Sequence, residues 1–222
     1  MAAPEVIVFD VNETLLSLEP ISLGLVTIFG PDPPVGEWFA RLLHGSLLAN
    51  ALDSYRPFGA IAVEALVAVA ARKGIQIGAD DARSVLAPMS KLPPHRDVLP
   101  GIRELAESGI RMAALTNGSR EVASAQIDNA GLGDLLERVI SVEEVGRFKP
   151  DPAPYLHAAQ VMHVPIGGMM LVAAHDWDCA GAMAVGAQAA FMRRPGVLWS
   201  MPAVIPDLIV EDVAELVAVL AG

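Results

Sequence analysis

The stretch VIVFDVNETLL, residues 6–16, decides the fold. Four consecutive large apolar residues, 6–9, are typical of a strand buried on both faces, as in a parallel sheet. Asp10 follows directly, and open α/β folds bind ligands at the carboxyl ends of such strands. Taken alone, the stretch leaves two interpretations open: Asp10 caps a turn or helix together with Asn12, or it is a catalytic carboxylate.

The composition narrows the class of protein. The chain has 222 residues, of which 53% are hydrophobic, so it can bury a large core, and this composition argues against intrinsic disorder. Its 26 acidic and 15 basic residues give a net charge of −11, which argues against nucleic acid or an anionic membrane as partner. No apolar stretch reaches the roughly 18 residues of a membrane span. With a single cysteine, Cys179, and no visible signal peptide, the default prediction is a cytoplasmic enzyme.

Two kinds of sequence alternate along the chain. Residues 18–92 contain no convincing strand, and periodicity predicts helices at about 35–51, 58–73 and 79–90. After a proline-rich boundary, helices alternate with strands predicted within 111–119, 138–144, 168–176, 188–193 and 207–210, and a last helix is expected over 213–222. This alternation indicates βαβ units and a parallel sheet. We therefore predict an α/β core domain at 1–16 and 93–222, and a helical cap domain at 17–92.

Polar residues follow four of the predicted strands. They are Asp10, the run Thr116-Asn117-Gly118, Lys149 in GRFKPDP, and HDWD at 175–178. Because the carboxyl ends of parallel strands meet at one edge of the sheet, these side chains should converge there. Four such groups together indicate a catalytic site.

These segments carry a family resemblance. FDVNETL, LTNGS, GRFKPDP and AAHDWDCAGA resemble, in order and spacing, the four motifs of the haloacid dehalogenase superfamily, and more narrowly its 2-haloacid dehalogenases of type II. The resemblance covers nearly the whole chain. It implies a Rossmann-like, doubly wound parallel sheet with a helical cap inserted after the first strand.

Two positions separate dehalogenase from phosphatase chemistry. Phosphatases of this superfamily need a second Asp two residues after the nucleophile, where this chain has Asn12, which offers no titrating proton. They also hold Mg²⁺ with an acid four residues before the last Asp of the fourth motif, where this chain has Ala174. We therefore expect no metal and no cofactor, although Asp176 and His175 remain as substitute metal ligands.

For a dehalogenase, the resemblance assigns roles to individual residues. Asp10 attacks the carbon that bears the halogen and forms an ester, and Lys149 keeps it ionised. Asp178 orients Lys149 and helps to position the water that hydrolyses the ester, with net inversion at carbon. The hydroxyls of Thr14 and Thr116 hydrogen-bond around the carboxylate.

Departures from the family pattern concern substrate binding. Known members have Tyr-Gly where this chain has Asn12-Glu13, Asn in place of His175, and a cap arginine where Phe39 stands. The nearest arginine, Arg41, is two residues further along, about 200° around a helix. The sequence candidates for substrate or halide binding are Asn12, Phe39, Arg41, Asn117, Tyr155, His175 and Trp177.

The sequence thus predicts a hydrolase that converts short 2-haloacids, of the haloacetate and L-2-halopropionate type, to 2-hydroxy acids. Two alternatives remain open: a small-molecule phosphatase with an altered Mg²⁺ site, and a non-catalytic protein that binds a carboxylate. The only expected partner is the small-molecule haloacid, with no nucleic acid or membrane. The halogen, the enantiomer, the natural substrate and the oligomeric state stay open, a homodimer being one option.

Overall fold

A computed structural model describes residues 3–221 of the protein, so Gly222, the last residue of the predicted C-terminal helix, and the first two residues of the core lie outside it. Within this part of the chain six strands form one sheet in the order β3-β2-β1-β4-β5-β6, and every neighbouring pair is parallel. The strands are β1 (Val6–Phe9), β2 (Met112–Thr116), β3 (Arg138–Ser141), β4 (Met169–Ala173), β5 (Gln188–Met192) and β6 (Leu208–Val210). The predicted doubly wound α/β fold is confirmed.

The strand β1 lies in the middle of the sheet, between β2 and β4. All four of its residues are fully buried, which explains the uninterrupted apolar run. Successive side chains of a strand point to opposite faces, so Ile7 and Phe9 join one core layer whereas Val6 and Val8 join the other. The central position places Asp10 at the middle of the carboxyl edge.

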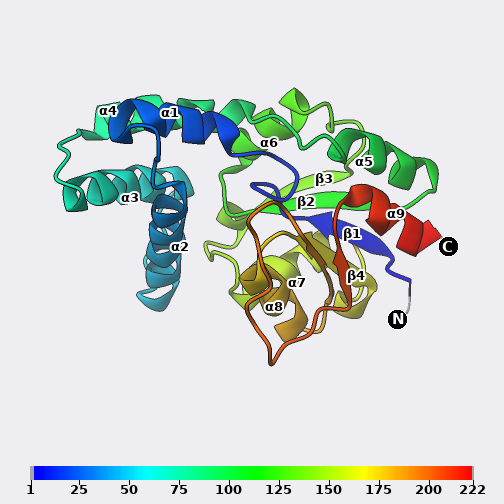
Figure 1. Ribbon diagram of the computed structural model, residues 1–222. Helices are drawn as coiled ribbons and strands as arrows, with labels where there is room; N and C mark the ends of the chain where they lie inside the picture. The colour runs from blue at the N-terminus through cyan, green and yellow to red at the C-terminus, as the bar shows by residue number, and fades with distance from the viewer. Residues whose placement is uncertain (1–2, 222) are drawn as a thin grey trace.

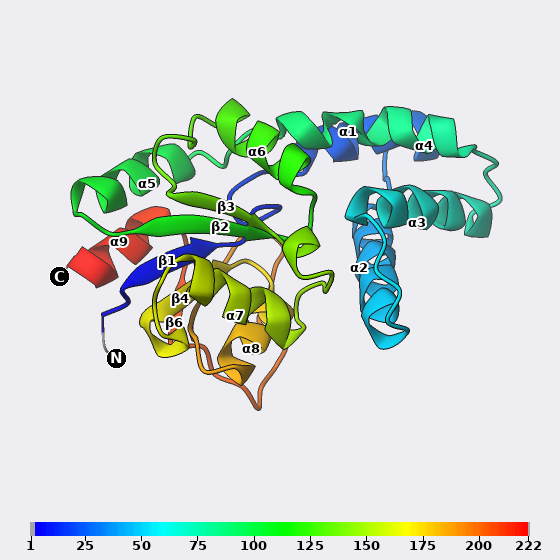
Figure 2. The same ribbon diagram turned by 180° about the vertical axis from the view of Figure 1, so that it is seen from behind.

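Helices cover both faces of the sheet (Figures 1 and 2). On one face lie α5 (Val98–Glu107), α6 (Arg120–Asn129) and α9 (Val213–Ala221), and on the other lie α7 (Pro152–Val161) and α8 (Asp176–Ala184). Short 3₁₀ turns occur at Val142–Glu144 and Ile166–Gly168. This three-layer arrangement leaves the carboxyl ends of the strands as the natural place for a ligand.

A helical segment follows β1, as predicted. It consists of α1 (Glu19–Phe29), α2 (Val35–Ala51), α3 (Phe58–Arg72), α4 (Ala79–Leu86) and a 3₁₀ helix (Ala87–Lys91). Figures 1 and 2 show these helices to one side of the sheet, with α1 and α4 running alongside each other. The sequence patterns predicted α2, α3 and α4 but missed α1. We propose to treat 17–92 as the cap domain and 1–16 with 93–222 as the core domain.

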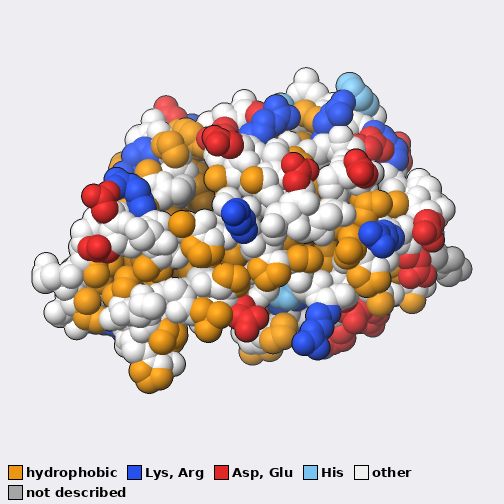
Figure 3. Space-filling view, turned by 90° about the horizontal axis from the view of Figure 1, so that it is seen from above, with side chains coloured by type: hydrophobic (Ala, Val, Ile, Leu, Met, Phe, Trp, Pro, Cys, Tyr) orange, Lys and Arg blue, Asp and Glu red, His pale blue; other side chains and the backbone are white. Residues whose placement is uncertain are grey.

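The surface agrees with the mixed charge of the sequence. Figure 3 shows one face of the molecule, on which acidic and basic side chains are interspersed with hydrophobic ones. Among residues 3–221, no helix combines the length and apolarity needed to cross a membrane.

Candidate active site

Asp10 lies at the end of β1 in a buried, fully hydrogen-bonded position. Its Oδ1 is 2.8 Å from Nζ of Lys149, and its Oδ2 accepts a 2.7 Å hydrogen bond from the hydroxyl of Thr14. Burial by itself would raise the pKa of Asp10, but Lys149 and His175 outweigh burial and hold this pKa well below its ordinary value. Asp10 is therefore an ionised carboxylate in a buried, polar site.

Lys149 is only 2% exposed and lies between two carboxylates. Besides Asp10, its ammonium group donates to Oδ2 of Asp178 at 2.5 Å and to the carbonyl of Leu115 at 3.0 Å. Burial opposes the charge of Lys149, but Asp10 and Asp178 raise its pKa above the ordinary value. The hydroxyl of Tyr155 donates to the other oxygen of Asp178 at 2.7 Å, so both oxygens of Asp178 are engaged.

The loop that carries Thr14 is fixed by three contacts from distant parts of the chain. The Thr14 hydroxyl accepts from the backbone N–H of Ala174 at 2.9 Å, which directs its own proton to Asp10. The buried guanidinium of Arg194 donates to the Thr14 carbonyl at 2.8 and 3.0 Å. His95 Nε2 lies 3.0 Å from the Glu13 carbonyl. Neither Arg194 nor His95 was singled out from the sequence, because neither belongs to a motif.

His175 forms a row with two carboxylates. Its Nδ1 is 3.2 Å from Oδ2 of Asp10, and its Nε2 is 2.9 Å from Oε2 of Glu13. The ring stacks with Phe39 and with Trp177, at centroid distances of 5.5 and 5.2 Å. Burial opposes the charged form, but the hydrogen bonds and charges of Asp10 and Glu13 raise the pKa of His175 to about 10. Because both ring nitrogens contact carboxylates, neither is free to bind halide in this arrangement.

Glu13 is the main site residue that sequence reasoning missed. The available signal was its place in the chain: it stands where the family pattern has glycine, three residues after the motif aspartate. Its backbone adopts a φ of 63°, the left-handed region that favours glycine. A glutamate kept in this conformation with its carboxylate on His175 deserves a functional explanation.

A small cavity of about 20 Å³ adjoins Asp10, with room for about one water molecule. It is lined by Asp10, Asn12, Phe39, Leu43, Phe58, Thr116, Asn117, His175 and Trp177. The structure thus brings together Asp10 and the predicted binding residues Asn12, Phe39, Asn117, His175 and Trp177.

The hydrogen-bond network orients the two amides at this cavity. Oδ1 of Asn12 accepts from the side-chain amide of Gln126 at 3.0 Å, and Oδ1 of Asn117 accepts from the backbone N–H of Lys149 at 2.9 Å. Gln126 uses the same nitrogen to donate to the Met89 carbonyl, which supports this assignment of nitrogen and oxygen. The NH₂ groups of both asparagines are the parts left to donate to a ligand.

Three predicted site residues are placed differently from expectation. The hydroxyl of Thr116 accepts from the backbone N–H of Gly118 at 3.0 Å and makes no hydrogen bond to Asp10 within residues 3–221. Tyr155 is fully buried, holds Asp178 and does not line the cavity.

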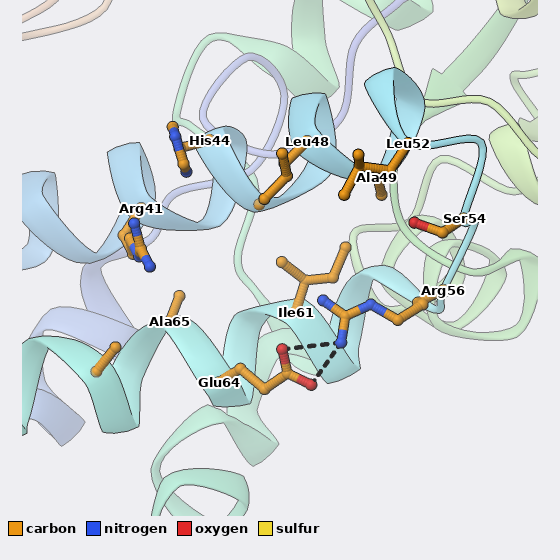
Figure 4. Close-up of a pocket in the computed structure, with 12 residues that line it drawn as sticks. Arg41, His44, Leu48, Ala49, Leu52, Ser54, Arg56, Ile61, Glu64 and Ala65 are labelled. Carbon is orange, nitrogen blue, oxygen red and sulfur yellow. Dashed lines mark hydrogen bonds and ion pairs between the residues drawn. The ribbon is translucent and has the colours of Figure 1, made fainter.

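The third is Arg41, which lies outside the cavity. Figure 4 shows it in an outer groove of about 310 Å³ between α2 and α3, beside His44 and near the Arg56–Glu64 ion pair. The physical reason is the 200° helical rotation between Phe39 and Arg41. Phe39, not Arg41, faces His175.

The donor set does not fit the Mg²⁺ site of phosphatase relatives. Ala174 offers no side-chain ligand, and the oxygen of Asn12 is taken by Gln126. Asp176, the substitute considered from the sequence, accepts instead from the backbone N–H of Trp177 and from the backbone and hydroxyl of Ser200. Within residues 3–221, no group of three or more acidic, histidine or cysteine side chains is placed to hold a metal ion.

Comparisons with known proteins identify the family. The profile of the haloacid dehalogenase-like hydrolase family matches residues 4–186. The chain belongs to this hydrolase family. It is 28% identical over 217 residues to the (S)-2-haloacid dehalogenase H-109 of Pseudomonas putida, covering 96% of each chain, and 25% identical to the haloacetate dehalogenase H-2 of Moraxella sp. (strain B), covering 98% of each.

Comparison with solved structures finds the same kind of protein. The crystal structure of the L-2-haloacid dehalogenase RSc1362 superposes with a TM-score of 0.93, covering 100% of both chains at 23% identity. The resemblance to 2-haloacid dehalogenases drawn from the four motifs is therefore confirmed at the level of family and fold, and the chain is a haloacid dehalogenase-like hydrolase.

Proposed function

We propose that the protein is a hydrolytic dehalogenase of short 2-haloacids, with Asp10 as nucleophile. The observation that carries the proposal is the ionised Asp10 carboxylate held by Lys149 at 2.8 Å, in a site whose donor set does not fit Mg²⁺. The names of the relatives, which act on (S)-2-haloacids and haloacetate, support this choice of substrate class.

The first step is displacement of halide by the carboxylate. An oxygen of Asp10 forms a bond to the carbon that bears the halogen, the carbon–halogen bond breaks, and an ester results. Lys149 and Thr14 fix the carboxylate, so little reorganisation is needed before attack. Asp178 and Tyr155 in turn hold Lys149 in place.

Substrate recognition uses neutral donors in place of a cap arginine. The NH₂ groups of Asn12 and Asn117 are available at the cavity for the substrate carboxylate or the departing halide. Phe39, Phe58 and Trp177 supply an apolar wall for the carbon chain.

The second step is hydrolysis of the ester. Water attacks the carbonyl carbon of Asp10, the 2-hydroxy acid leaves and the carboxylate is regenerated. Displacement inverts the substrate carbon and hydrolysis leaves it untouched, so the product has inverted configuration.

The test is halide release from chloroacetate, fluoroacetate and L-2-chloropropionate, with and without EDTA, beside a phosphatase assay on p-nitrophenyl phosphate. We expect halide release that EDTA does not affect, and no phosphatase activity. A single turnover in H₂¹⁸O should place ¹⁸O in Asp10 rather than in the first molecule of product. Mg²⁺-dependent phosphate release without halide release would favour the phosphatase alternative.

A further inference from the structure

Hydrolysis of the Asp10 ester needs a group that accepts a proton from the attacking water, and this inference rests on the proposed function. Of the groups that contact Asp10, Lys149 is a charged donor and Thr14 is a neutral hydroxyl. Asp178 lies behind Lys149, with its two oxygens on Lys149 and Tyr155. His175 is the remaining side chain in contact with Asp10, through Nδ1 at 3.2 Å.

We propose that His175, oriented by Glu13, is the general base for hydrolysis of the Asp10 ester. Nδ1 faces Asp10 and Nε2 faces Glu13 at 2.9 Å, so a nucleophile, an imidazole and a carboxylate form one row. A base held within reach of the reacting group and oriented by a third group is the arrangement that activates water in many hydrolases. The adjacent cavity, about 20 Å³, has room for the water.

The aromatic neighbours fix the plane of the imidazole. Phe39 from α2 and Trp177 from α8 each stack with it, at interplanar angles of 23° and 28°. With Glu13 holding Nε2, the ring keeps Nδ1 directed at the Asp10 carboxyl group. Glu13 acts on the reaction only through His175 and is a positioning residue.

The charge of Asp10 decides when His175 can act as a base. The imidazole ring contacts two carboxylates, those of Asp10 and Glu13. The other charged groups nearby are further away: Lys149 and Asp178 lie beyond Asp10, and the carboxylate of Asp176 is hydrogen-bonded to Ser200. In the free enzyme the carboxylate of Asp10 favours the imidazolium form. Ester formation removes that negative charge, while burial continues to disfavour the cation. Once the ester has formed, His175 therefore loses its proton to solvent more readily. The neutral ring that results can act as a base.

The protons balance over the cycle. After halide leaves, the imidazolium loses one proton to solvent by way of Glu13, whose side chain is 29% exposed. Water then adds to the ester carbonyl of Asp10 and gives a proton to Nδ1. The bond between the Asp10 carbonyl carbon and the ester oxygen breaks, and this oxygen, which stays on the substrate carbon, takes that proton. The remaining carboxylic acid proton of Asp10 passes to Nδ1, which restores the starting state. The sum is haloacid plus water giving hydroxy acid, halide and one proton.

The backbone of Glu13 is an independent observation for this role. A non-glycine residue at φ 63° is strained, and strain of this kind concentrates at functional sites. Glycine would fit this turn without strain but would leave Nε2 of His175 without its carboxylate.

The test separates the two half-reactions with chloroacetate under rapid mixing. In His175→Gln, which keeps hydrogen bonding but cannot accept the proton, we expect a burst of about one halide per enzyme. Steady-state turnover should then fall about 10²-fold or more, the usual contribution of a general base. Intact-mass measurement should find the enzyme carrying one carboxymethyl group on Asp10. Glu13→Gly should also accumulate the ester, with steady-state turnover lowered about tenfold. This second variant tests the inference even if His175→Gln fails to fold.

The matched control is His157→Gln, which removes an imidazole that makes a similar 2.8 Å contact with Glu144 on the surface. Its burst and turnover should equal those of the wild type. If the wild-type enzyme releases halide but neither His175→Gln nor Glu13→Gly accumulates the ester on Asp10, this inference alone is overturned. Absence of halide release from the wild type would instead overturn the proposed function and, with it, this inference.

Discussion

Lys149 and Asp10 are 139 residues apart in the chain, yet Nζ of Lys149 lies 2.8 Å from Oδ1 of Asp10 in the interior of the protein. Breaking a buried pair usually leaves an uncompensated charge, which is costly. Here Asp178 and the Leu115 carbonyl also hold the ammonium group, so loss of one carboxylate leaves it partnered. The nucleophile can therefore be neutralised by mutation with the fold intact.

We predict that Asp10→Asn lowers halide release from chloroacetate at least 10³-fold, because an amide cannot act as the attacking carboxylate. Circular dichroism should show an unchanged fold. Asp176→Asn is the matched control, since Asp176 hydrogen-bonds toward Ser200, and it should keep turnover within about threefold. Turnover by Asp10→Asn above a tenth of wild type, with deamidation excluded by mass spectrometry, would refute the assignment of the nucleophile.

Chelation should leave the reaction unchanged. The positions at which phosphatase relatives keep acids hold Asn12 and Ala174, and the Asn12 oxygen is bound by Gln126. We expect equal kcat and KM for chloroacetate before and after dialysis against EDTA. Loss of activity on dialysis, with recovery on adding Mg²⁺, would contradict this prediction.

The amide of Asn117 gives a prediction about substrate binding. In Asn117→Asp, one carboxylate oxygen still accepts from the backbone N–H of Lys149, but the NH₂ donor is replaced by a negative charge. We expect KM for chloroacetate to rise about tenfold, equivalent to about 1.4 kcal/mol. Neutral chloroacetamide is the control substrate, and its KM should change little because it lacks the carboxylate. An equal rise for both compounds would mean that Asn117 does not recognise charge.

Arg41 gives a prediction in the opposite direction. It lies in the outer groove between α2 and α3, so Arg41→Ala should change kcat/KM for haloacids by less than about threefold (Figure 4). Phe39→Ala, which removes one of the rings stacked on His175, should lower kcat/KM about tenfold or more. A large loss in Arg41→Ala would indicate that the cap moves to bring this arginine to the substrate.

Most of the fold and the centre of the site could be predicted from the sequence because both depend on short local patterns. The apolar run of β1 identified a central buried strand, and polar residues after four strands identified the edge where they meet. The pairings of Lys149 with Asp10 and of Asp178 with Lys149 followed from the motifs, and the structure places these groups in contact.

Other features were not predictable because they depend on three-dimensional packing. Helix α1 was missed since its sequence, with Pro20 near the start and Gly24 inside, has low helix propensity. It is stabilised by packing on α4, where Gly24 allows a close approach to Val85. The role of Glu13 depends on an unusual φ angle and on a partner 162 residues away, and neither is visible in a local pattern.

The last prediction concerns stability and pH. The pKa of His175 is raised from 6.5 in the unfolded chain to about 10 in the folded protein by its contacts with Asp10 and Glu13, against the effect of burial. A group with a raised pKa stabilises the folded state fully below its unfolded pKa, and this stabilisation is lost as pH rises toward the folded pKa. Between about pH 7 and pH 10 the free energy of unfolding should therefore decrease, by at most about 1.4 kcal/mol per pH unit.

Urea unfolding of wild type and His175→Asn at pH 7, 8 and 9 measures this contribution. The variant lacks the titrating ring, so its free energy of unfolding should depend less on pH than that of the wild type, and the difference between the two should shrink as pH rises. His157→Asn, which removes the surface imidazole that contacts Glu144, should keep the wild-type slope. Parallel pH dependence in wild type and His175→Asn would mean that His175 is not held as an imidazolium between Asp10 and Glu13, because a neutral ring contributes no proton linkage in this range.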